Sequence, residues 1–440
     1  MKPLRVAVVG AGPSGLYAAG HLLEGPGGTY LDGRLTALHT RAVEVDVFDR
    51  LPTQWGLVRH GVAPDHPDKK QVATVFEQIA ARPGFRFFGN IEVGRDVLTR
   101  ELAQWYDAVV YAVGATGDAT LGIPGEDLPG CLAARAFVAW YNGHPDYSTA
   151  PIDLSGERAV VIGNGNVAMD VARLLTTPID TLARTDIADH ALDALRASRV
   201  REVVVLGRRG RQHGAFNNPE LEELGHLPGV DLAVVHGEPE DSAALDPSTA
   251  RKLRTLHDYA TRPSTGAERR IVLRFQTSPL EVLGTESVRG LRVRGPDGDE
   301  VLDAGLVLRA IGYFGTPTPG LPFDHDRGVI PHTDGRITGV PGSYVTGWIK
   351  RGPRGIIGTN KKCARDTVRS LLADADAGAL RPGTHTGEQV ERALRERRPA
   401  LVDQVGWLAL DHHERAAGLA AGRPRVKVTD LAGQLAHGVR

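Results

Sequence analysis

The sequence predicts an α/β protein that contains two parallel sheets, each with helices on its faces. Two observations lead to this fold class. Short apolar runs rich in β-branched residues alternate with helical stretches along most of the chain, which is typical of parallel α/β layers. A glycine-rich turn also occurs twice, near residues 10 and 163, each time between a predicted strand and a predicted helix. With 440 residues, the chain is long enough for more than one domain.

The expected strands are short, and helices follow both glycine-rich turns. We expect helices after Gly12, Asn166 and Gly358. The polar segment Glu238–Ser264 is expected to contain a helical connection, and Gly387–Arg398 and Val402–Ala417 are expected to form surface helices of unassigned function. The expected strands are Arg5–Val9, Val43–Phe48, Ala108–Val113, Ala159–Ile162, Glu202–Leu206, Leu306–Ile311 and Ser343–Thr346.

Composition narrows the function classes. Apolar residues make up 41% of the chain and charged residues 24%, as in a globular protein with a core. The net charge of −1 provides no general basic field for nucleic acid or an anionic membrane, and no apolar run approaches the roughly 20 residues of a membrane span. Two cysteines, Cys131 and Cys363, are too few for a disulfide framework or a cluster site. The adjacent pair His412 and His413 lacks the i, i+4 spacing of a helical metal site. We therefore expect a cytoplasmic protein with no nucleic-acid partner, no membrane span and no metal site.

The first glycine-rich turn, Gly10-Ala11-Gly12-Pro13-Ser14-Gly15, follows the first strand and opens a helix. This is the spacing of a Rossmann-like dinucleotide-binding fold in its required context. Gly10 permits the tight turn, Gly12 lets a pyrophosphate approach the backbone, and Gly15 lets the helix pack closely on the strand. The helix N-terminus then favours phosphate. An ordinary glycine-rich turn is the alternative, because the motif alone has low specificity.

Asp49 ends the second predicted strand, where a carboxylate can accept hydrogen bonds from the ribose of a dinucleotide. Its distance from Gly15 exceeds the usual spacing of about 20 residues, and the glycine-rich polar loop Gly25–Arg41 accounts for the excess. The alternative is a strand-end carboxylate without a ligand.

The second turn, Gly163-Asn164-Gly165-Asn166-Val167-Ala168, has an accepted alanine in the third small position. The next strand, Glu202–Leu206, is followed by Arg208 and Arg209. Arginine binds a 2′-phosphate through bidentate charge-assisted bonds, whereas an acid would repel it. The pair therefore predicts NADP(H) rather than NAD(H), and two solvated surface arginines are the alternative.

Two dinucleotide folds in one chain indicate that one cofactor passes electrons to the other. We expect FAD as the tightly held carrier and NADP(H) as the exchanging one, with hydride transfer between nicotinamide and isoalloxazine. The chain has no C-x-x-C pair, because Cys131 and Cys363 are far apart in sequence. We therefore expect the electrons to leave the flavin for an external acceptor rather than an internal dithiol.

Several longer motifs resemble the adrenodoxin reductase-like branch of the ferredoxin–NADP⁺ reductases, along nearly the whole chain. The stretches around His66 and Lys361 are more specific than either glycine-rich turn. Besides the second turn itself, the motifs are Thr53-Gln54-Trp55-Gly56-Leu57-Val58-Arg59, Gly61-Val62-Ala63-Pro64-Asp65-His66-Pro67, Gly207-Arg208-Arg209-Gly210, Gly347-Trp348-Ile349-Lys350-Arg351-Gly352-Pro353 and Gly355-Ile356-Ile357-Gly358-Thr359-Asn360-Lys361-Lys362.

The resemblance implies an NADP(H)-binding domain of residues 117–311 inserted into a discontinuous FAD-binding domain of residues 1–116 and 312–440. The chain would cross between them at Gly114–Gly117 and Gly312–Gly315. The sequence departs from the family at Asp49, where a longer Glu is frequent, and at Pro219 and Ala119. The implied FAD contacts are Ser14, Asp49, Leu57, Val93, Trp348, Gly355, Ile356 and Ile357, and the implied NADP contacts are Asn164, Gly165, Asn166, Val167, Arg208, Arg209, Glu220 and Gly355.

Three side chains have two readings each. The resemblance implies that His66 and Glu223 lie near the flavin and the nicotinamide, where a histidine can relay a proton near neutral pH. The alternatives are a hydrogen-bonded structural histidine and a plain helix-surface carboxylate. Trp348 would cover the flavin ring, or it packs in the core.

The function expected from the sequence is that of an NADPH-dependent ferredoxin reductase, an FAD-containing oxidoreductase. FAD would accept hydride from NADPH and pass single electrons to a ferredoxin-type iron–sulfur protein. An NADPH flavoprotein that reduces quinones or other small acceptors is the alternative enzyme, and an NADP(H)-sensing subunit without turnover is the alternative outside catalysis. The basic residues of 350–354 with Lys361 and Lys362 could attract an acidic partner or merely be solvated. The sequence assigns no oligomeric state.

Overall fold

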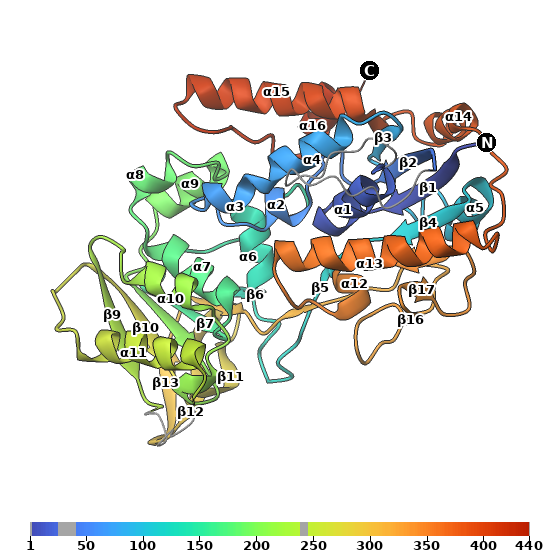
Figure 1. The fold of residues 1–440 in the computed structure, drawn as a ribbon. Helices are drawn as coiled ribbons and strands as arrows, with labels where there is room; N and C mark the ends of the chain where they lie inside the picture. Colours follow the sequence, from blue (N-terminus) through green and yellow to red (C-terminus); the bar gives the residue numbers. More distant parts are fainter. Residues whose placement is uncertain (1, 25–40, 238–244, 440) are drawn as a thin grey trace.

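The computed structural model describes residues 2–24, 41–237 and 245–439. Figure 1 shows two bodies side by side, one built around an eight-stranded sheet and the other around a six-stranded sheet. Here the first domain means the eight-stranded sheet with its helices, and the second domain means the six-stranded sheet with its helices and a small antiparallel sheet. The predicted loop Gly25–Arg41 lies, except for Arg41, outside the described residues.

The first sheet has the strand order β16-β17-β18-β4-β1-β2-β3-β19. The five strands from β18 to β3 run parallel, as predicted, while β16, β17 and β19 add antiparallel edges. The bounds are β1 (Leu4–Val9), β2 (Val43–Phe48), β3 (Phe85–Gly89), β4 (Ala108–Tyr111), β16 (His332–Thr333), β17 (Arg336–Ile337), β18 (Ser343–Val345) and β19 (Val402–Asp403).

Both faces of this sheet are covered, which is why its strands are apolar throughout. Along β1, Val6 and Val8 pack into one core, and Ala7 and Val9 pack into the core on the opposite face. The first core is closed by α1 (Pro13–Leu22), α4 (Val72–Ala80), α13 (Ile357–Asp376) and α15 (Gln404–Ala420). The second is closed by α5 (Thr99–Trp105), α12 (Trp348–Arg351) and α14 (Gly387–Arg397).

The second domain has the strand order β6-β14-β7-β8-β10-β9, with every pair parallel. Helices cover one face, and the antiparallel sheet β11-β12-β13 covers the other. The strands are β6 (Cys131–Ala133), β7 (Arg158–Ile162), β8 (Glu202–Leu206), β9 (Val230–Val235), β10 (Arg269–Arg274), β11 (Ser278–Gly284), β12 (Val288–Gly295), β13 (Gly298–Asp303) and β14 (Leu306–Arg309). The helices are α6 (Ala134–Tyr141), α7 (Asn166–Thr176), α8 (Ile179–Leu182), α9 (Asp189–Arg196), α10 (Asn218–Leu224) and α11 (Pro247–Thr261), and a short 3₁₀ turn covers Arg211–His213.

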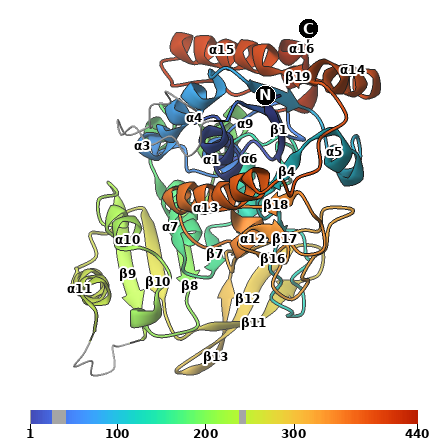
Figure 2. The same cartoon turned by 45° about the vertical axis from the view of Figure 1, so that its right-hand side comes forward.

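The chain crosses between the domains in two adjacent segments, β5 (Gly117–Asp118) and β15 (Tyr313–Phe314), which pair antiparallel. The remaining helices are α2 (Leu57–His60), α3 (Pro67–Lys70) and α16 (Leu431–Gly438). In Figure 2, α14 and α15 lie at the end of the molecule opposite to β11–β13. Among the described residues, no helix combines the length and apolarity needed to cross a membrane. The domain boundaries at 116/117 and 311/312 stay a prediction.

All the strands expected from the sequence are present, and α1, α7 and α13 begin at or next to the expected positions. The expected surface helix Val402–Ala417 instead begins with β19 and continues as α15, one face of which is buried. Two strands, β4 and β14, end two residues earlier than predicted. The N–H groups of Ala112 and Ala310 still donate to Val9 and Ile162 at 2.7 Å, but their carbonyl groups face the glycine-rich turns. The expected helical connection is α11, although residues 238–244 lie outside the described part of the chain. The β11–β13 sheet was not anticipated, and neither were the strands β3, β6, β9, β10 and β19 of the two main sheets.

Candidate functional site

The first glycine-rich turn has the geometry that its sequence predicts. Gly10 has φ +107°, and a Cβ there would lie 2.5 Å from the carbonyl oxygen of Ala112. A Cβ on Gly15 would overlap the carbonyl of Gly10, so the first turn of α1 rests directly on β1. Helix α1 begins after Gly12 without a side-chain cap. Its amino end therefore offers backbone N–H groups and positive dipole to an anion.

Asp49 is tied to this turn by its own carboxylate. Its Oδ2 accepts from the backbone N–H of Ala11 at 2.8 Å, and its Oδ1 accepts from that of Leu51 at 3.0 Å. Burial raises the pKa of Asp49, and these two backbone N–H groups oppose the shift. Each carboxylate oxygen can accept more than one hydrogen bond, so Asp49 can still bind a ribose. In the structure the carboxylate of Asp49 stabilises the turn through these two hydrogen bonds. The ribose contact stays a prediction.

Apolar side chains lie open to solvent close to this turn. Leu57 is 38% exposed at the start of α2, and Ile356 is 66% exposed at the start of α13. Two glycines approach the turn closely, Gly56 before α2 and Gly347 before α12. A Cβ on Gly56 would lie 2.8 Å from the Cα of Gly12, and a Cβ on Gly347 would overlap Ser14 Oγ. Exposed apolar surface beside a free helix terminus suits a ligand with both a ring system and a phosphate.

The remaining predicted FAD residues lie on neighbouring segments. Trp348 begins α12, its ring centroid is 5.3 Å from that of Tyr313, and its buried Nε1–H has no partner among the described groups. Gly355, with φ +87°, leads into α13, whose first turn also lacks a side-chain cap. Val93 follows β3 and packs on the second core of the first domain. An unpartnered indole N–H and a second free helix terminus are both features that a bound dinucleotide could satisfy.

The second glycine-rich turn repeats the geometry of the first. Gly163 has φ +110°, and a Cβ there would overlap the carbonyl of Ala310. No atom lies within 4 Å of the Cβ position of Gly165, so the space beside this glycine is open. Helix α7 starts after Gly165 without a side-chain cap, and Val167 packs half-buried against the core of the second domain. This turn is therefore a second anion-binding helix terminus.

The two asparagine side chains of the second turn accept hydrogen bonds that the sequence did not reveal. Asn164 Oδ1 accepts from the N–H of Ala215 at 3.4 Å, and Asn166 Oδ1 accepts from that of Asn217 at 2.8 Å. Both carboxamides thus hold the segment that leads into α10, and Pro219 fits the first turn of that helix. Any dinucleotide contact of these asparagines would use their remaining amide groups or their backbone.

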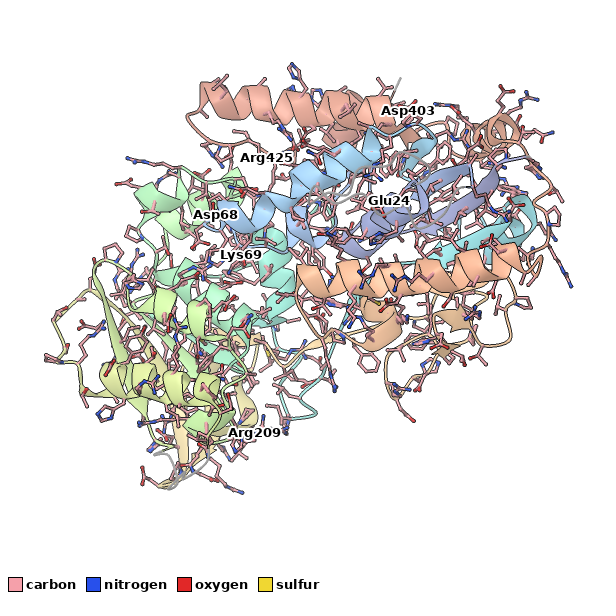
Figure 3. All side chains as sticks on the ribbon, viewed as in Figure 1. Glu24, Asp68, Lys69, Arg209, Asp403 and Arg425 are labelled. Carbon is pink, nitrogen blue, oxygen red and sulfur yellow. The ribbon has the colours of Figure 1, made fainter. Side chains whose placement is uncertain are left out.

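Arg208 and Arg209 lie exposed directly after β8, and Figure 3 labels Arg209 on the second domain. Among the described residues, neither guanidinium has a hydrogen-bond or ion-pair partner. Gly207, which directly precedes Arg208, packs closely on the second turn, because a Cβ on Gly207 would overlap the side chain of Asn164. The two free cations therefore stand beside the second turn, where a 2′-phosphate would be expected.

The structure brings His66 and Glu223 together across the two domains. His66 Nε2 lies 2.8 Å from Glu223 Oε2 on α10. Arg173 on α7 donates to Asp65 at 2.6 and 3.0 Å and to Glu223 at 3.2 Å. Burial raises the pKa of Asp65, but the hydrogen bonds and charge of Arg173 outweigh it, so the pKa falls below its ordinary value. Sequence reasoning missed Arg173, whose only signal is a buried charge on a helix with an apolar face.

Glu220 lies beside this cross-domain contact. Its Oε1 accepts from Lys69 of the first domain at 3.2 Å, and its buried Oε2 has no hydrogen-bond partner among the described groups. Figure 3 labels Asp68 and Lys69 where the two domains meet. The predicted catalytic pair and Glu220 therefore belong to one polar contact between the domains. Whether His66 and Glu223 act in the reaction stays a prediction.

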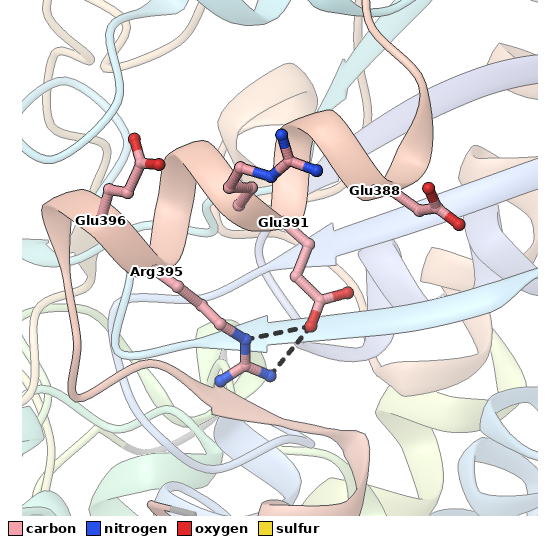
Figure 4. A pocket seen from close by; sticks show the side chains of 5 residues that line it. Glu388, Glu391, Arg395 and Glu396 are labelled. Carbon is pink, nitrogen blue, oxygen red and sulfur yellow. Dashed lines mark hydrogen bonds and ion pairs between the residues drawn. The ribbon is translucent and has the colours of Figure 1, made fainter.

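Two surface hollows lie elsewhere and hold none of the predicted residues. The first is formed by charged side chains along α14, where Glu391 and Arg395 pair at 2.9 Å (Figure 4). The second lies around Arg158, Glu202 and Arg270 at the amino ends of β7, β8 and β10. Ligands of open α/β sheets bind at the carboxyl ends, so the second hollow is not the dinucleotide site, and the first is lined by side chains of α14 alone.

The two cysteines are buried free thiols in different domains. Cys131 lies on β6, and burial raises its pKa to about 11. Cys363 lies on α13, where its Sγ accepts from the N–H of Gly347 at 3.4 Å. Neither thiol has a partner thiol with which to form a dithiol pair.

Comparison with known proteins assigns the chain to a family. The pattern of the family "Pyridine nucleotide-disulphide oxidoreductase" matches residues 4–212. The NADPH-ferredoxin reductase FprA of Mycobacterium tuberculosis (strain ATCC 25618 / H37Rv) is 49% identical over 466 residues, which cover the whole of both chains. The chain belongs to the adrenodoxin reductase-like ferredoxin–NADP⁺ reductase family.

Other family members support the assignment over the full length. The mitochondrial NADPH:adrenodoxin oxidoreductase of Salvelinus fontinalis is 40% identical over 459 residues, covering 97% of this chain and 89% of that protein. The structure described as Mycobacterium tuberculosis FprA in complex with NADPH superposes with a TM-score of 0.92 at 47% identity, covering 99% of this chain and 100% of that one. The predicted fold of two Rossmann-like domains is confirmed.

Proposed function

We propose that the protein is an NADPH-dependent ferredoxin reductase that contains FAD. The observation that supports this most directly is the contact between His66 and Glu223. This contact joins the domain that contains the first glycine-rich turn to the domain that contains the second glycine-rich turn. The two glycine-rich turns therefore belong to domains that are in direct contact, as electron transfer between two bound cofactors requires.

The first domain has the features that FAD needs. The turn at Gly10 and Gly12 and the free amino end of α1 suit the pyrophosphate, and Asp49 suits the ribose. Leu57, Ile356 and the indole of Trp348 supply apolar surface and an unpartnered donor for a ring system. We therefore assign Ser14, Asp49, Leu57, Val93, Trp348 and Gly355 to Ile357 to this cofactor.

The second domain has the features that NADPH needs. The amino end of α7 at Asn164–Val167 suits the pyrophosphate, and Arg208 and Arg209 are free to pair with a 2′-phosphate. Glu220 has a buried carboxylate oxygen without a partner at the domain boundary, where the nicotinamide end would arrive. We propose residues 117–311 as the NADP(H)-binding domain and residues 1–116 with 312–440 as the FAD-binding domain.

When bound, FAD supplies the exchange between a two-electron donor and a one-electron acceptor. The side chains at the boundary position the reactants and exclude water. His66 Nε2 and Glu223 Oε2 lie 2.8 Å apart and are joined by one hydrogen bond, so this pair would hold a proton at the domain boundary, where the two cofactors would meet. Arg173 fixes both partners, because it binds Asp65 next to His66 and also binds Glu223.

The acceptor that we propose is an acidic iron–sulfur protein of the ferredoxin type. Arg354 and Lys362 are exposed on the connection between α12 and α13 and on α13, close in sequence to the exposed Ile356. Lys350 of α12 is half-buried and donates to Thr367 at 3.0 Å. A basic surface next to the flavin segment would raise the rate at which an acidic partner arrives. We also propose a cytoplasmic location, because two buried free thiols fit a reducing compartment.

Anaerobic stopped-flow absorbance tests the proposal. The purified protein should be yellow, bleach faster with NADPH than with NADH, and regain its colour when oxidised ferredoxin is added. Reoxidation by a quinone but not by ferredoxin would favour the alternative reductase. A colourless protein that binds NADPH without turnover would overturn the assignment in favour of an NADP(H)-sensing subunit.

A further inference from the structure

The segment 421–430, here called the strap, connects α15 to α16 and runs along the boundary between the domains. It carries three basic side chains, Arg423, Arg425 and Lys427. Arg425 binds Asp411 at 2.7 Å and Glu414 at 3.0 Å, both on α15, and Figure 3 shows it beside that helix. Arg425 therefore anchors the strap to the first domain.

Arg423 reaches the second domain. Its side chain is only 8% exposed, and its Nε donates to the carbonyl of Thr185 at 3.0 Å. The other two nitrogens bind the carbonyl of Ile187 and the carboxylate of Asp189. All three acceptors lie between α8 and the first turn of α9. One arginine thus holds a whole turn of the second domain against the strap.

Lys427 makes a second, fully buried link. Its Nζ lies 3.1 Å from Asp186 and 3.3 Å from Asn142 Oδ1, both in the second domain, and 3.3 Å from the carbonyl of Arg59 in the first. Lys70 of α3 donates to the same carboxylate at 2.6 Å. Burial would raise the pKa of Asp186, but the charges of Lys427 and Lys70 hold it below its ordinary range. Two cations from the first domain thus converge on one anion of the second.

The covalent connection alone does not fix the domains. The chain passes between the domains in the short segments β5 and β15, which pair with each other and lie next to Gly114 (φ +76°) and Gly312 (φ +122°), whose Cβ positions meet nothing within 4 Å. Short glycine-flanked crossings of this kind permit rotation. The strap crosses the boundary on the side of α8 and α9, away from these crossings, and so opposes that rotation.

We propose that Arg423 and Lys427 are positioning residues, and that the strap sets the orientation of the second domain in which NADPH meets the flavin. The proposal rests on the function proposed above. Electron transfer between two rings depends steeply on their placement, and an error of about 1 Å costs roughly 100-fold in rate. Neither side chain touches a glycine-rich turn, so loss of either should leave both cofactors bound.

The first readout is a distance and does not depend on activity. Spin labels on cysteines introduced at exposed Asp258 of α11 and exposed Ala373 of α13 report the separation of the domains. The native thiols are buried. The parent holoenzyme should give one narrow distance distribution. Arg423→Ala should broaden it or add a second population. Arg397→Ala is the matched control, because Arg397 pairs with Glu101 at 3.0 and 2.8 Å inside the first domain.

The second readout is the rate of flavin bleaching by NADPH per bound FAD. Arg423→Ala should slow it roughly tenfold or more, with the FAD content and the Kd for NADP⁺ within about threefold of the parent. A role in stability alone would lower Tm and leave this rate unchanged. If Arg423→Ala does not fold, Asp189→Asn removes the ion pair from an exposed partner (59% exposed) and should shift both readouts in the same direction.

An unchanged distance distribution overturns the proposal, and so does an unchanged rate per flavin. If the parent does not bleach with NADPH, the proposed function fails, whereas the distance measurement still shows whether the strap holds the domains.

Discussion

Replacing Arg208 and Arg209 with serine tests the choice of NADPH over NADH. Both guanidinium groups are exposed and have no partner among the described residues, so the change breaks no existing ion pair and should leave folding intact. A hydrogen bond to a charged group contributes about 1.5–3 kcal/mol, and exposure favours the lower value. Two such contacts therefore contribute about 3 kcal/mol, and because about 1.4 kcal/mol is tenfold in Kd, NADPH should bind roughly 100-fold more weakly.

The assay is titration of the oxidised holoenzyme with NADP⁺ and NAD⁺, together with the bleaching rate at saturating NADPH and NADH. The Kd for NAD⁺ should stay within about threefold, because NAD⁺ has no 2′-phosphate. Arg199→Ser is the matched control, because Arg199 lies at the opposite end of β8 and should change neither Kd. Equal losses for the two nucleotides, or a loss below about threefold for NADP⁺, would refute the assignment of these arginines.

Three other substitutions and one change of pH separate the cofactor sites from the supports of the fold. Gly10→Ala should abolish FAD retention, because a Cβ there would lie 2.5 Å from a carbonyl at φ +107°, whereas Gly163→Ala should spare FAD and weaken NADP⁺ binding. Glu414→Ala leaves the buried cation Arg59 without the carboxylate that it binds at 2.5 Å through Nη2 and at 2.8 Å through Nη1, and should lower the free energy of unfolding by about 3–5 kcal/mol. The pKa of Asp65 lies below its ordinary value. Its contribution to the free energy of unfolding should therefore be complete above pH ~5 and be lost as pH falls below ~4.

Each of these outcomes has a control. FAD content is read from the ratio of flavin to protein absorbance, and loss of FAD in Gly163→Ala as well would mean that the two turns do not act separately. Urea unfolding of Arg397→Ala, an exposed ion pair, should change by less than about 1 kcal/mol, and a similar value for Glu414→Ala would contradict the buried-pair reasoning. For Asp65, the free energies of unfolding of the parent and of Asp65→Asn should converge at low pH. A constant difference between them from pH 7 to pH 3 would contradict the shifted pKa.

The sequence predicted the parts of the fold whose signals are local. β2 and β8 have the predicted bounds, and α7 begins at the predicted turn, because apolar runs and glycine spacing are properties of neighbouring residues. The β11–β13 sheet was missed although β12 alternates buried Val288 and Val293 with exposed arginines. The period-2 pattern is interrupted at Gly290 and Leu291, which are both buried, and the exposed arginines make the segment resemble a surface loop.

The sequence predicted the residues of the two glycine-rich turns but not all the contacts that join the two domains. The residues of each glycine-rich turn could be named, because their chemistry depends on a tight local spacing. The contact of Arg173 with Asp65 spans 108 residues of sequence and exists only after the domains meet, so no local pattern could reveal it. The same holds for Glu414, whose side chain is fully buried on α15, because acids on a buried helix face weaken the hydrophobic signal that predicts burial.

The pairing of β18 with β4 constrains how the chain can fold during synthesis. Ser343 pairs with Val109, so the first sheet stays incomplete on the ribosome until the intervening segment has emerged. The six strands of the second sheet all lie between Cys131 and Arg309, and that domain can close without help from either side. Since domains fold as units while the chain elongates, the inserted domain would form first. Its folded termini would then hold the ends of β4 and β18 close together, which shortens the loop that the first sheet must close.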